Sequence, residues 1–361
     1  MRYFKKIKLK NFRNFKIYEG EFSKNCNIFY GENGLGKTNI LESISLFGKG
    51  KGFRNDRIKN MIQVSEQKFI NTCEFSSFNQ AYKIQVVSEK YQNRYIKKTS
   101  FNEDFNRETL EYLNSLITFI IFLPDMERLF LTSPSYRRNF IDRFIFSKNK
   151  NYNTLVNKYK KNINERNKLL LSKFYDEEWL KKLEEDISLS GIEIYKLRSF
   201  QIEMLQKHLN LLNKNKKLPF AINIQHLDEF YNNKLDTEYY KSSLESAREV
   251  DKLTGGAKYG PHRSDLMCYV AQDFSAEQLS TGEQKTIVLL LILAQCNYLV
   301  NECKLNPVIL MDEICSHLDA NNRSILLKLS QEFDLQIFMT GTEKNLFSFL
   351  STNTSYYNIT N

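Results

Sequence analysis

The chain has 361 residues, enough for two domains that each bury a core of their own. Its 52 Lys and Arg residues against 42 Asp and Glu give a formal charge of +10, which suits a polyanionic partner but also fits a compositional drift along the whole chain. The six cysteines include no C-x-x-C pair and no companion histidine, which argues against a zinc site or a disulfide framework and favours a reducing compartment. The longest apolar block, residues 287–294, is too short to cross a bilayer, so we expect a cytoplasmic protein with no membrane partner.

The first third of the chain has the pattern of mixed strands and helices. Residues 4–9 alternate in the manner of a strand, and the apolar run 26–30 predicts a second strand that ends at a glycine-rich loop. Apolar residues then recur at helical spacing over residues 38–47, and strand-like patterns return over 69–97 and 117–123. A strand, a glycine-rich loop and a helix therefore follow one another in an α/β domain.

The sequence pattern changes from mixed to helical at residue 133. Ser133 and Pro134 read as the N-cap and first residue of a helix, and the pattern stays helical to about residue 215. Strand-like sequence resumes near Pro219. The glycines between 255 and 260 indicate turns where the chain returns to the first domain. We therefore expect residues 1–130 and 255–361 to form one α/β domain and residues 131–254 to form a second, mainly helical domain.

Residues 31–38, GENGLGKT, fit the phosphate-loop pattern G-x-x-x-x-G-K-[ST], which a chain with this glycine content matches by chance about once in two hundred. In such a loop the backbone N–H groups wrap the β-phosphate, the lysine reaches the β and γ oxygens, and the last hydroxyl ligates Mg²⁺. An ordinary turn is the alternative. We expect the loop and its next residue to bind ATP through Gly31, Glu32, Asn33, Gly34, Leu35, Gly36, Lys37, Thr38 and Asn39.

A phosphate loop needs a magnesium carboxylate on a neighbouring strand, and residues 307–313, PVILMDE, supply one. Asp312 is the expected partner of Thr38 at Mg²⁺. The next residue, Glu313, is placed to polarise the attacking water as a general base. An apolar run before two acids is also common as a helix cap or loop, but the phosphate loop in the same chain favours the metal role.

Residues 279–285, LSTGEQK, carry a third pattern. Ser280 and Glu283 have the spacing of a capping box, so a helix begins here, and Gly282 leaves the free N–H groups at its mouth open to a phosphate. A plain helix cap explains the same spacing. The pattern LSxGE/Q is nevertheless the signature motif of ABC-type ATPases, and Ser316-His317-Leu318-Asp319 matches their D-loop.

Six segments together closely resemble the RecF family of bacterial DNA repair ATPases. They run the full length of the chain: LKNFRNF at 9–15, GENGLGKTNILESI at 31–44, SPSYRRNFID at 133–142, GPHRSDL at 260–266, LSTGEQK at 279–285 and VILMDEICSHLD at 308–319. The resemblance implies an ABC-type ATPase head with a helical arm, too short-armed for an SMC protein and without the spanning segments of a transporter. It also implies a homodimer in which Ser280, Gly282, Glu283 and Asp319 help to close ATP and Mg²⁺ between two subunits.

The family role implied is an ATP-gated clamp on double-stranded or gapped DNA that helps to load recombinase, with slow ATP hydrolysis and with RecO and RecR as partners. The alternative is an ATP-dependent scaffold at replication forks whose main contacts are with protein. Salt dependence of DNA binding separates the two, because phosphate contacts give a steep negative slope of log affinity against log salt.

The sequence leaves the roles of several residues open. The resemblance places Arg13 near the phosphates, although it could simply be an exposed arginine at a strand end. Thr340 stands where transporters have their switch histidine and could position water only weakly, while the Q-loop neighbourhood, residues 118–125, carries no glutamine. Arg137 and Arg138 could touch DNA or be structural.

Two further features of these segments bear on structure. Arg138 and Asp142 have the i,i+4 spacing of a helical ion pair, so a structural role for Arg138 is at least as well supported as a contact with DNA. Residues 260–263 have no mechanism that the sequence reveals, and a hydrogen-bonded structural role is favoured for His262.

Overall fold

The computed structural model describes residues 2–78, 80–92, 94–214, 220–231, 235–270, 274–315, 319–350 and 353–360. The chain divides into two compact units, which we call the head (Met1–Glu127 and Thr281–Asn361) and the arm (Arg128–Ser280). The second boundary differs from the expected return to the first domain at residue 255. The reason is strand pairing, because β9 (Asp265–Val270) pairs along its whole length with β8 (Ile222–Leu227) and so stays in the arm.

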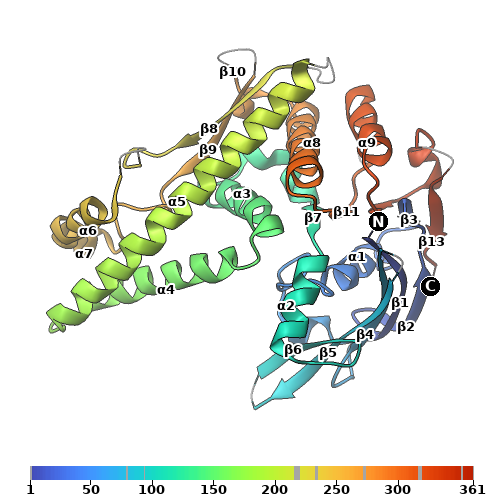
Figure 1. Cartoon of the computed structure of the whole chain (residues 1–361), viewed down its shortest axis with the longest axis horizontal. Helices are drawn as coiled ribbons and strands as arrows, with labels where there is room; N and C mark the ends of the chain where they lie inside the picture. The colour runs from blue at the N-terminus through green and yellow to red at the C-terminus, as the bar shows by residue number, and fades with distance from the viewer. Residues whose placement is uncertain are drawn as a thin grey trace. The chain divides into compact units, whose positions relative to one another are not determined.

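The head contains two sheets (Figure 1). The first is antiparallel throughout, and its strand order is β2 (Phe15–Glu21), β1 (Arg2–Phe12), β4 (Ile70–Ser77), β5 (Gln80–Tyr91) and β6 (Arg94–Phe101). Alternate residues of β4 and β5 are buried, as expected for a sheet with one face on a core.

The second sheet is parallel throughout, with strand order β13 (Ser355–Asn358), β3 (Cys26–Tyr30), β12 (Ile337–Gly341), β11 (Val308–Met311) and β7 (Phe119–Phe122). Strands β11 and β12 are buried at every position, which explains their continuous apolar runs. Because all five strands point the same way, the loops after β3, β11 and β12 emerge at one edge. This edge carries the candidate site.

The helices of the head begin with α1, which directly follows the glycine-rich loop. They are α1 (Lys37–Ser45), η1 (Ile58–Met61), α2 (Arg107–Leu116), α8 (Thr281–Asn297), the π-helical turn η4 (Tyr298–Glu302), α9 (Ala320–Glu332) and η5 (Lys344–Phe347). In α8, every residue from Gln284 to Cys296 is buried, so this helix is part of the core of the head. Strand β3 has the predicted bounds, and α1 begins one residue before the predicted helix.

The arm is mainly helical (Figure 1). Its elements are α3 (Pro134–Lys148), α4 (Tyr152–Leu171), α5 (Glu177–Lys214), α6 (Thr237–Ser246), α7 (Arg248–Thr254) and η3 (Ala276–Gln278), with a small antiparallel sheet of β10 (Phe274–Ser275), β9 and β8. The turn η2 (Pro124–Leu131) spans the first boundary between head and arm. The predicted fold class, an α/β head with a mainly helical arm, is confirmed. Among the residues described, no helix is long and apolar enough to span a membrane.

The two arginines of SPSYRRNFID are structural in the arm. Arg137 is buried and binds both carboxylate oxygens of Asp265, at 2.8 and 2.6 Å. Arg138 donates to the carbonyl of Ser264 at 2.6 Å and not to Asp142, so the predicted i,i+4 pair is wrong. Asp142 instead binds Arg198 through both carboxylate oxygens at 2.9 Å, because α5 packs against α3 and brings a longer-range partner.

The role of the GPHR segment, which the sequence left open, is also structural. A Cβ at Gly260 would collide with the hydroxyls of Tyr159 and Tyr240, and the φ of +135° at Gly260 is one that other residues rarely adopt. His262 Nε2 donates to the carbonyl of Ala257 at 3.0 Å, so its Nδ1 accepts the Tyr159 hydroxyl at 2.7 Å. The favoured reading of His262 as a hydrogen-bonded structural residue agrees with these contacts.

Candidate functional site

The glycine-rich loop leaves β3 and enters α1 through three glycines with positive φ. The φ values are +142° at Gly31, +88° at Gly34 and +100° at Gly36, all in the region that glycine tolerates best. At Gly36 a Cβ would lie 2.5 Å from the side chain of Asn14, so glycine is also required for close packing. The loop thus has the shape of an anion-binding cradle at the N-terminus of a helix.

Lys37 lies at the first position of α1 and folds back over this loop. Its Nζ donates to the carbonyls of Gly31 and Glu32, both at 2.7 Å. Burial lowers the pKa of Lys37, while the nearby charges of Glu313 and Asp312 act in the opposite direction. The ammonium is therefore already held over the loop, close to the two acids at the end of β11.

Asp312 joins three elements of the head. Its Oδ1 accepts the hydroxyl of Thr38 at 2.8 Å and the hydroxyl of Thr340 at 2.7 Å. A carboxylate oxygen and a hydroxyl this close are hard oxygen donors of the kind that bind Mg²⁺, which keeps several waters and takes few protein ligands. Thr38 and Asp312 therefore fit the predicted metal role.

Glu313 follows Asp312 in an unusual backbone conformation. Its φ is +48°, which is uncommon for a residue with a side chain, and it is exposed. Its amide donates to the hydroxyl of Thr340 at 2.8 Å, which helps to hold this conformation. Backbone strain of this kind clusters at functional sites, and it supports the expected role of Glu313.

Thr340 does not have the geometry expected of a residue that positions water. It is completely buried, its hydroxyl hydrogen is used for Asp312, and its oxygen accepts the amide of Glu313. Its role is to orient the two acids, because its strand β12 lies directly beside β11.

Arg13, which the resemblance places near the phosphates, contacts the helix that follows the phosphate loop. Its guanidinium binds both carboxylate oxygens of Glu42 at 2.7 and 2.9 Å, Asp56 at 2.8 Å and the carbonyl of Asn60 at 2.8 Å. Glu42 lies on α1 and is completely buried, so the arginine neutralises a buried acid of the helix that follows the phosphate loop. The residue next to it, Asn14, is the one that contacts the loop.

Asn14 is a site residue that sequence reasoning missed. Its Nδ2 donates to the carbonyl of Leu35 at 3.0 Å, and its Oδ1 accepts Nδ2 of Asn39 at 2.8 Å. Asn14 lies in the turn between β1 and β2, and through these two hydrogen bonds the turn supports the phosphate loop. The segment LKNFRNF pointed to this turn, but its arginine was the more conspicuous residue.

The signature segment LSTGEQK leads into α8, which begins at Thr281, so Ser280 lies immediately before the helix and is exposed. A Cβ added at Gly282 would have no neighbour within 4 Å. The side chain at position 280 is thus exposed, and there is space beside the backbone of Gly282.

The D-loop region enters α9. Asp319 is the N-cap of α9, where its side chain accepts the amide of Asn322 at 2.7 Å. Ser316, His317 and Leu318 lie outside the described residues. Asn322 also accepts the hydroxyl of Thr286 on α8 at 3.0 Å, so the helix after the signature segment and the helix after the D-loop are joined by a buried hydrogen bond.

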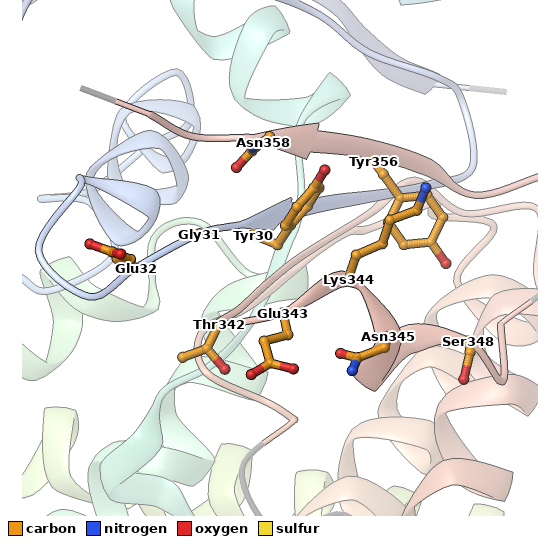
Figure 2. A pocket seen from close by; sticks show the side chains of 10 residues that line it. All are labelled: Tyr30, Gly31, Glu32, Thr342, Glu343, Lys344, Asn345, Ser348, Tyr356 and Asn358. Carbon is orange, nitrogen blue, oxygen red and sulfur yellow. The ribbon is translucent and has the colours of Figure 1, made fainter.

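A hollow of about 660 Å³ opens beside the start of the phosphate loop (Figure 2). It lies where β3, β12 and β13 end, and Lys344 on its rim lies over the ring of Tyr356, 5.0 Å from the ring centre. The sequence did not predict it, since its walls come from three separate segments of the chain. They are Tyr30, Gly31, Glu32, Thr342, Glu343, Lys344, Asn345, Ser348, Tyr356 and Asn358.

The fold resembles solved structures along its whole length. It matches a structure described as the recombination mediator protein RecF-ATPrS in the RecFOR pathway, with a TM-score of 0.83, 25% identity and coverage of 99% of this chain and 96% of the other. A RecF-ATP structure of the same pathway matches with a TM-score of 0.80, 27% identity and coverage of 95% and 92%. An Smc head domain from Pyrococcus furiosus shares the fold at a TM-score of 0.53 and 19% identity, covering 96% and 91% of the two chains.

Curated sequences agree with the structural likeness. The protein described as "DNA replication and repair protein RecF" of Rickettsia bellii (strain OSU 85-389) is 34% identical over 347 residues, and the one of Rickettsia africae (strain ESF-5) is 32% identical over 339 residues; each match covers 93% of both chains. The family described as "RecF/RecN/SMC N terminal domain" matches residues 3–361. The phosphate loop, the acids at the end of β11 and the signature segment agree with these sequence and structure matches. We conclude that the chain belongs to the RecF family.

Proposed function

We propose that this protein is an ATP-dependent DNA-binding protein of recombinational repair and replication-fork maintenance, and that it works as a homodimeric clamp on double-stranded or gapped DNA. The observation that carries the proposal is the convergence of Lys37, Thr38 and Asp312 at one edge of the parallel sheet. The relatives are described as DNA replication and repair proteins and as a recombination mediator, which supports the biological role.

In the proposed mechanism the loop residues 31–38 bind the triphosphate of ATP through their N–H groups. Lys37 would exchange the carbonyls of Gly31 and Glu32 for the β and γ oxygens of ATP. Thr38 and Asp312 would hold Mg²⁺, which neutralises charge on the phosphates.

Hydrolysis is assigned to Glu313. Its exposed carboxylate would accept a proton from the attacking water, while Thr340 holds its backbone in place from β12. Thr340 stands where transporters have their switch histidine, and the Q-loop neighbourhood, residues 118–125, carries no glutamine. We therefore propose slow, DNA-dependent turnover that serves as a switch.

Assembly follows from the signature segment. Exposed Ser280 and the open Gly282 of one subunit would complete the ATP site of the other, so that two ATP molecules are enclosed in a dimer. Contacts that exist only in the dimer shift the population toward it when ATP is bound. The description of similar structures as part of a RecFOR pathway supports RecO and RecR as partners that help to load recombinase.

Sedimentation of the protein with and without ATP and gapped DNA tests this proposal. We expect a monomer alone, a dimer with ATP, and a DNA-bound dimer with both. A salt series on the last species should give a steep fall of DNA affinity with salt, because the phosphate backbone is the main contact. A protein that stays monomeric with ATP, or that binds DNA with little salt dependence, contradicts the clamp and favours a scaffold that acts through protein contacts.

A further inference from the structure

The chain passes between head and arm twice, and both crossings are irregular in their backbone. The first crossing lies between Glu127 and Arg128, within η2, where Arg128 has the non-helical angles φ −113° and ψ 34°. The second lies between Ser280 and Thr281, and Leu279 just before it is extended, with ψ 155°. Each crossing is therefore a short joint between regular turns.

On the head side an ion pair connects the two crossings. Nζ of Lys285 lies 2.7 Å from Oε1 of Glu127, and the two side chains are 3% and 25% exposed. Glu127 is the last residue of the head before the first joint. Lys285 is about one helical turn into α8, after the second joint. We call this pair the head brace.

On the arm side a single arginine connects the same two segments. Nη1 of Arg137 donates to the carbonyls of Phe130 and Thr132, at 3.0 and 2.6 Å, just after the first joint. The same Nη1 lies 3.7 Å from Oε1 of Glu277, three residues before Ser280. We call these contacts the arm brace.

The head brace is costly to bury and so needs an explanation beyond stability. A buried ion pair contributes little net free energy compared with apolar residues of the same shape, but it fixes geometry because either charge alone is strongly destabilising. Here it fixes the position of one crossing relative to the other. Ser280, which the proposed function assigns to the ATP of the second subunit, lies at one of these crossings.

We propose that Glu127 and Lys285, together with Arg137, are positioning residues that set Ser280 and the start of α8 for the ATP of a second subunit. The inference rests on the proposed function, because the effect of the two braces on assembly exists only if the signature segment of one subunit contacts the ATP of the other. It adds residues that lie outside the phosphate loop and outside the signature positions themselves, and it predicts that loosening either brace weakens assembly while nucleotide binding by the monomer persists.

The test uses Glu127→Gln and Lys285→Met in the full chain. The first measurement is hydrogen exchange of the nucleotide-free monomer. We expect amides of residues 128–132 and 279–283 to exchange at least tenfold faster in both variants, with exchange in β3 and β11 unchanged. Unchanged exchange at the joints in both variants overturns the inference, whether or not ATP drives dimerisation.

The second measurement separates positioning from folding. We expect the affinity of each monomer for a fluorescent ATP analogue to stay within about threefold of wild type, since the phosphate loop is intact, whereas the dimer dissociation constant at saturating ATP rises at least tenfold. Lys285→Arg should restore the dimer. The matched control is Lys182→Met, which removes an exposed ion pair with Glu185 on α5 and should change neither readout.

The outcomes distinguish this inference from the proposed function. If wild type itself fails to dimerise with ATP, the proposed clamp is wrong. Hydrogen exchange alone then decides whether the head brace holds the two joints in place. If wild type dimerises and both variants dimerise as tightly, the head brace does not position Ser280 and the inference is wrong, even if the variants melt at lower temperature. Should Lys285→Met fail to fold, Glu127→Gln, which keeps the shape of the side chain, decides the same question.

Discussion

Thr340 donates its hydroxyl hydrogen to Oδ1 of Asp312 at 2.7 Å, across the boundary between two adjacent parallel strands. The same hydroxyl accepts the amide of Glu313 at 2.8 Å, so one buried threonine orients both acids of the site. The hydroxyl of Thr340, the residue that stands where transporters have their switch histidine, is therefore engaged with the two acids of the site. Its effect on ATP should pass through the carboxylate that it holds.

Replacing Thr340 with Val keeps the shape and removes the hydroxyl. Asp312 loses a donor and the amide of Glu313 loses its acceptor, which should lower the free energy of unfolding by about 1–3 kcal/mol. Calorimetric titration should show weaker Mg²⁺-ATP binding, by roughly tenfold, because the carboxylate is no longer fixed. Thr340→Ser keeps the hydroxyl and is the matched control; equal loss in both variants would place the effect in packing.

Lys37→Met should abolish tight ATP binding. The ammonium that now bonds the carbonyls of Gly31 and Glu32 is the group placed to meet the β and γ phosphates, and a methionine fills the same space without charge. The readout is the dissociation constant of a fluorescent ATP analogue. An affinity within a few-fold of wild type would refute the assigned role, whereas Lys344→Met, on the rim of the neighbouring hollow, is expected to retain binding.

Asp312 and Glu313 should have separable defects. Asp312→Asn weakens a metal ligand and should reduce Mg²⁺-ATP affinity, while Glu313→Gln removes only the proposed base and should preserve binding and stop hydrolysis. Binding is measured by titration and hydrolysis by phosphate release in a single turnover. If Glu313→Gln hydrolyses ATP at the wild-type rate, another group is the base.

Two features that follow from local sequence patterns are present in the structure. The bounds of β3 follow from an apolar run closed by glycine, and the meeting of Thr38 with Asp312 follows from two motifs that end parallel strands. The roles of Arg13 and Thr340 depend on partners far away in sequence. Glu42 lies on a different element from Arg13, and the register of Met311 beside Met339 brings Asp312 next to Thr340.

The contacts of the arm also depend on partners that are distant in sequence and that a local pattern does not reveal. Arg138 and Asp142 satisfy the helical spacing rule, yet Asp142 pairs with Arg198, because α5 packs against α3. A local pairing is worth only about 0.2–0.5 kcal/mol in an exposed helix, so a buried bidentate partner outcompetes it. Which partner is buried depends on helix packing, and a single sequence does not reveal that packing.

Mild acid should destabilise the arm through two histidines. Burial lowers the pKa of His226 and of His262 to about 4 each. In the unfolded chain each histidine takes up a proton near pH 6.5, whereas the folded arm resists protonation down to about 4, so stability is present above pH 6.5 and is lost as the pH falls toward 4.

The full effect is about 3 kcal/mol for each histidine. Melting temperatures of wild type, His226→Asn and His262→Asn between pH 7 and pH 5 measure it, in a range where most carboxylates stay ionised. Each variant should lose part of the pH dependence while starting from a lower stability at pH 7. An identical slope in all three proteins would show that the histidines are not the groups that titrate.

The assembly prediction depends on the exposed Ser280 at the start of α8. Under the proposed function, ATP gains contacts from Ser280 and the Gly282 backbone of a second subunit only in the dimer, and a ligand that binds one state better shifts the population toward it. Ser280→Arg would introduce a bulky cation and remove the hydroxyl at that position. The variant should still bind ATP at residues 31–38, because the substitution leaves the phosphate loop unchanged.

The expected result for Ser280→Arg is a monomer at ATP concentrations where wild type is dimeric. Its DNA affinity should fall as well, since a dimer presents twice the basic surface to the phosphate backbone, even though the substitution itself adds a positive charge. That added charge makes the test stringent, because simple electrostatics predicts tighter DNA binding and loss of the dimer predicts weaker binding. Light scattering at saturating ATP decides the matter: a Ser280→Arg dimer as tight as wild type would exclude a signature segment that acts in the second subunit and would favour the scaffold.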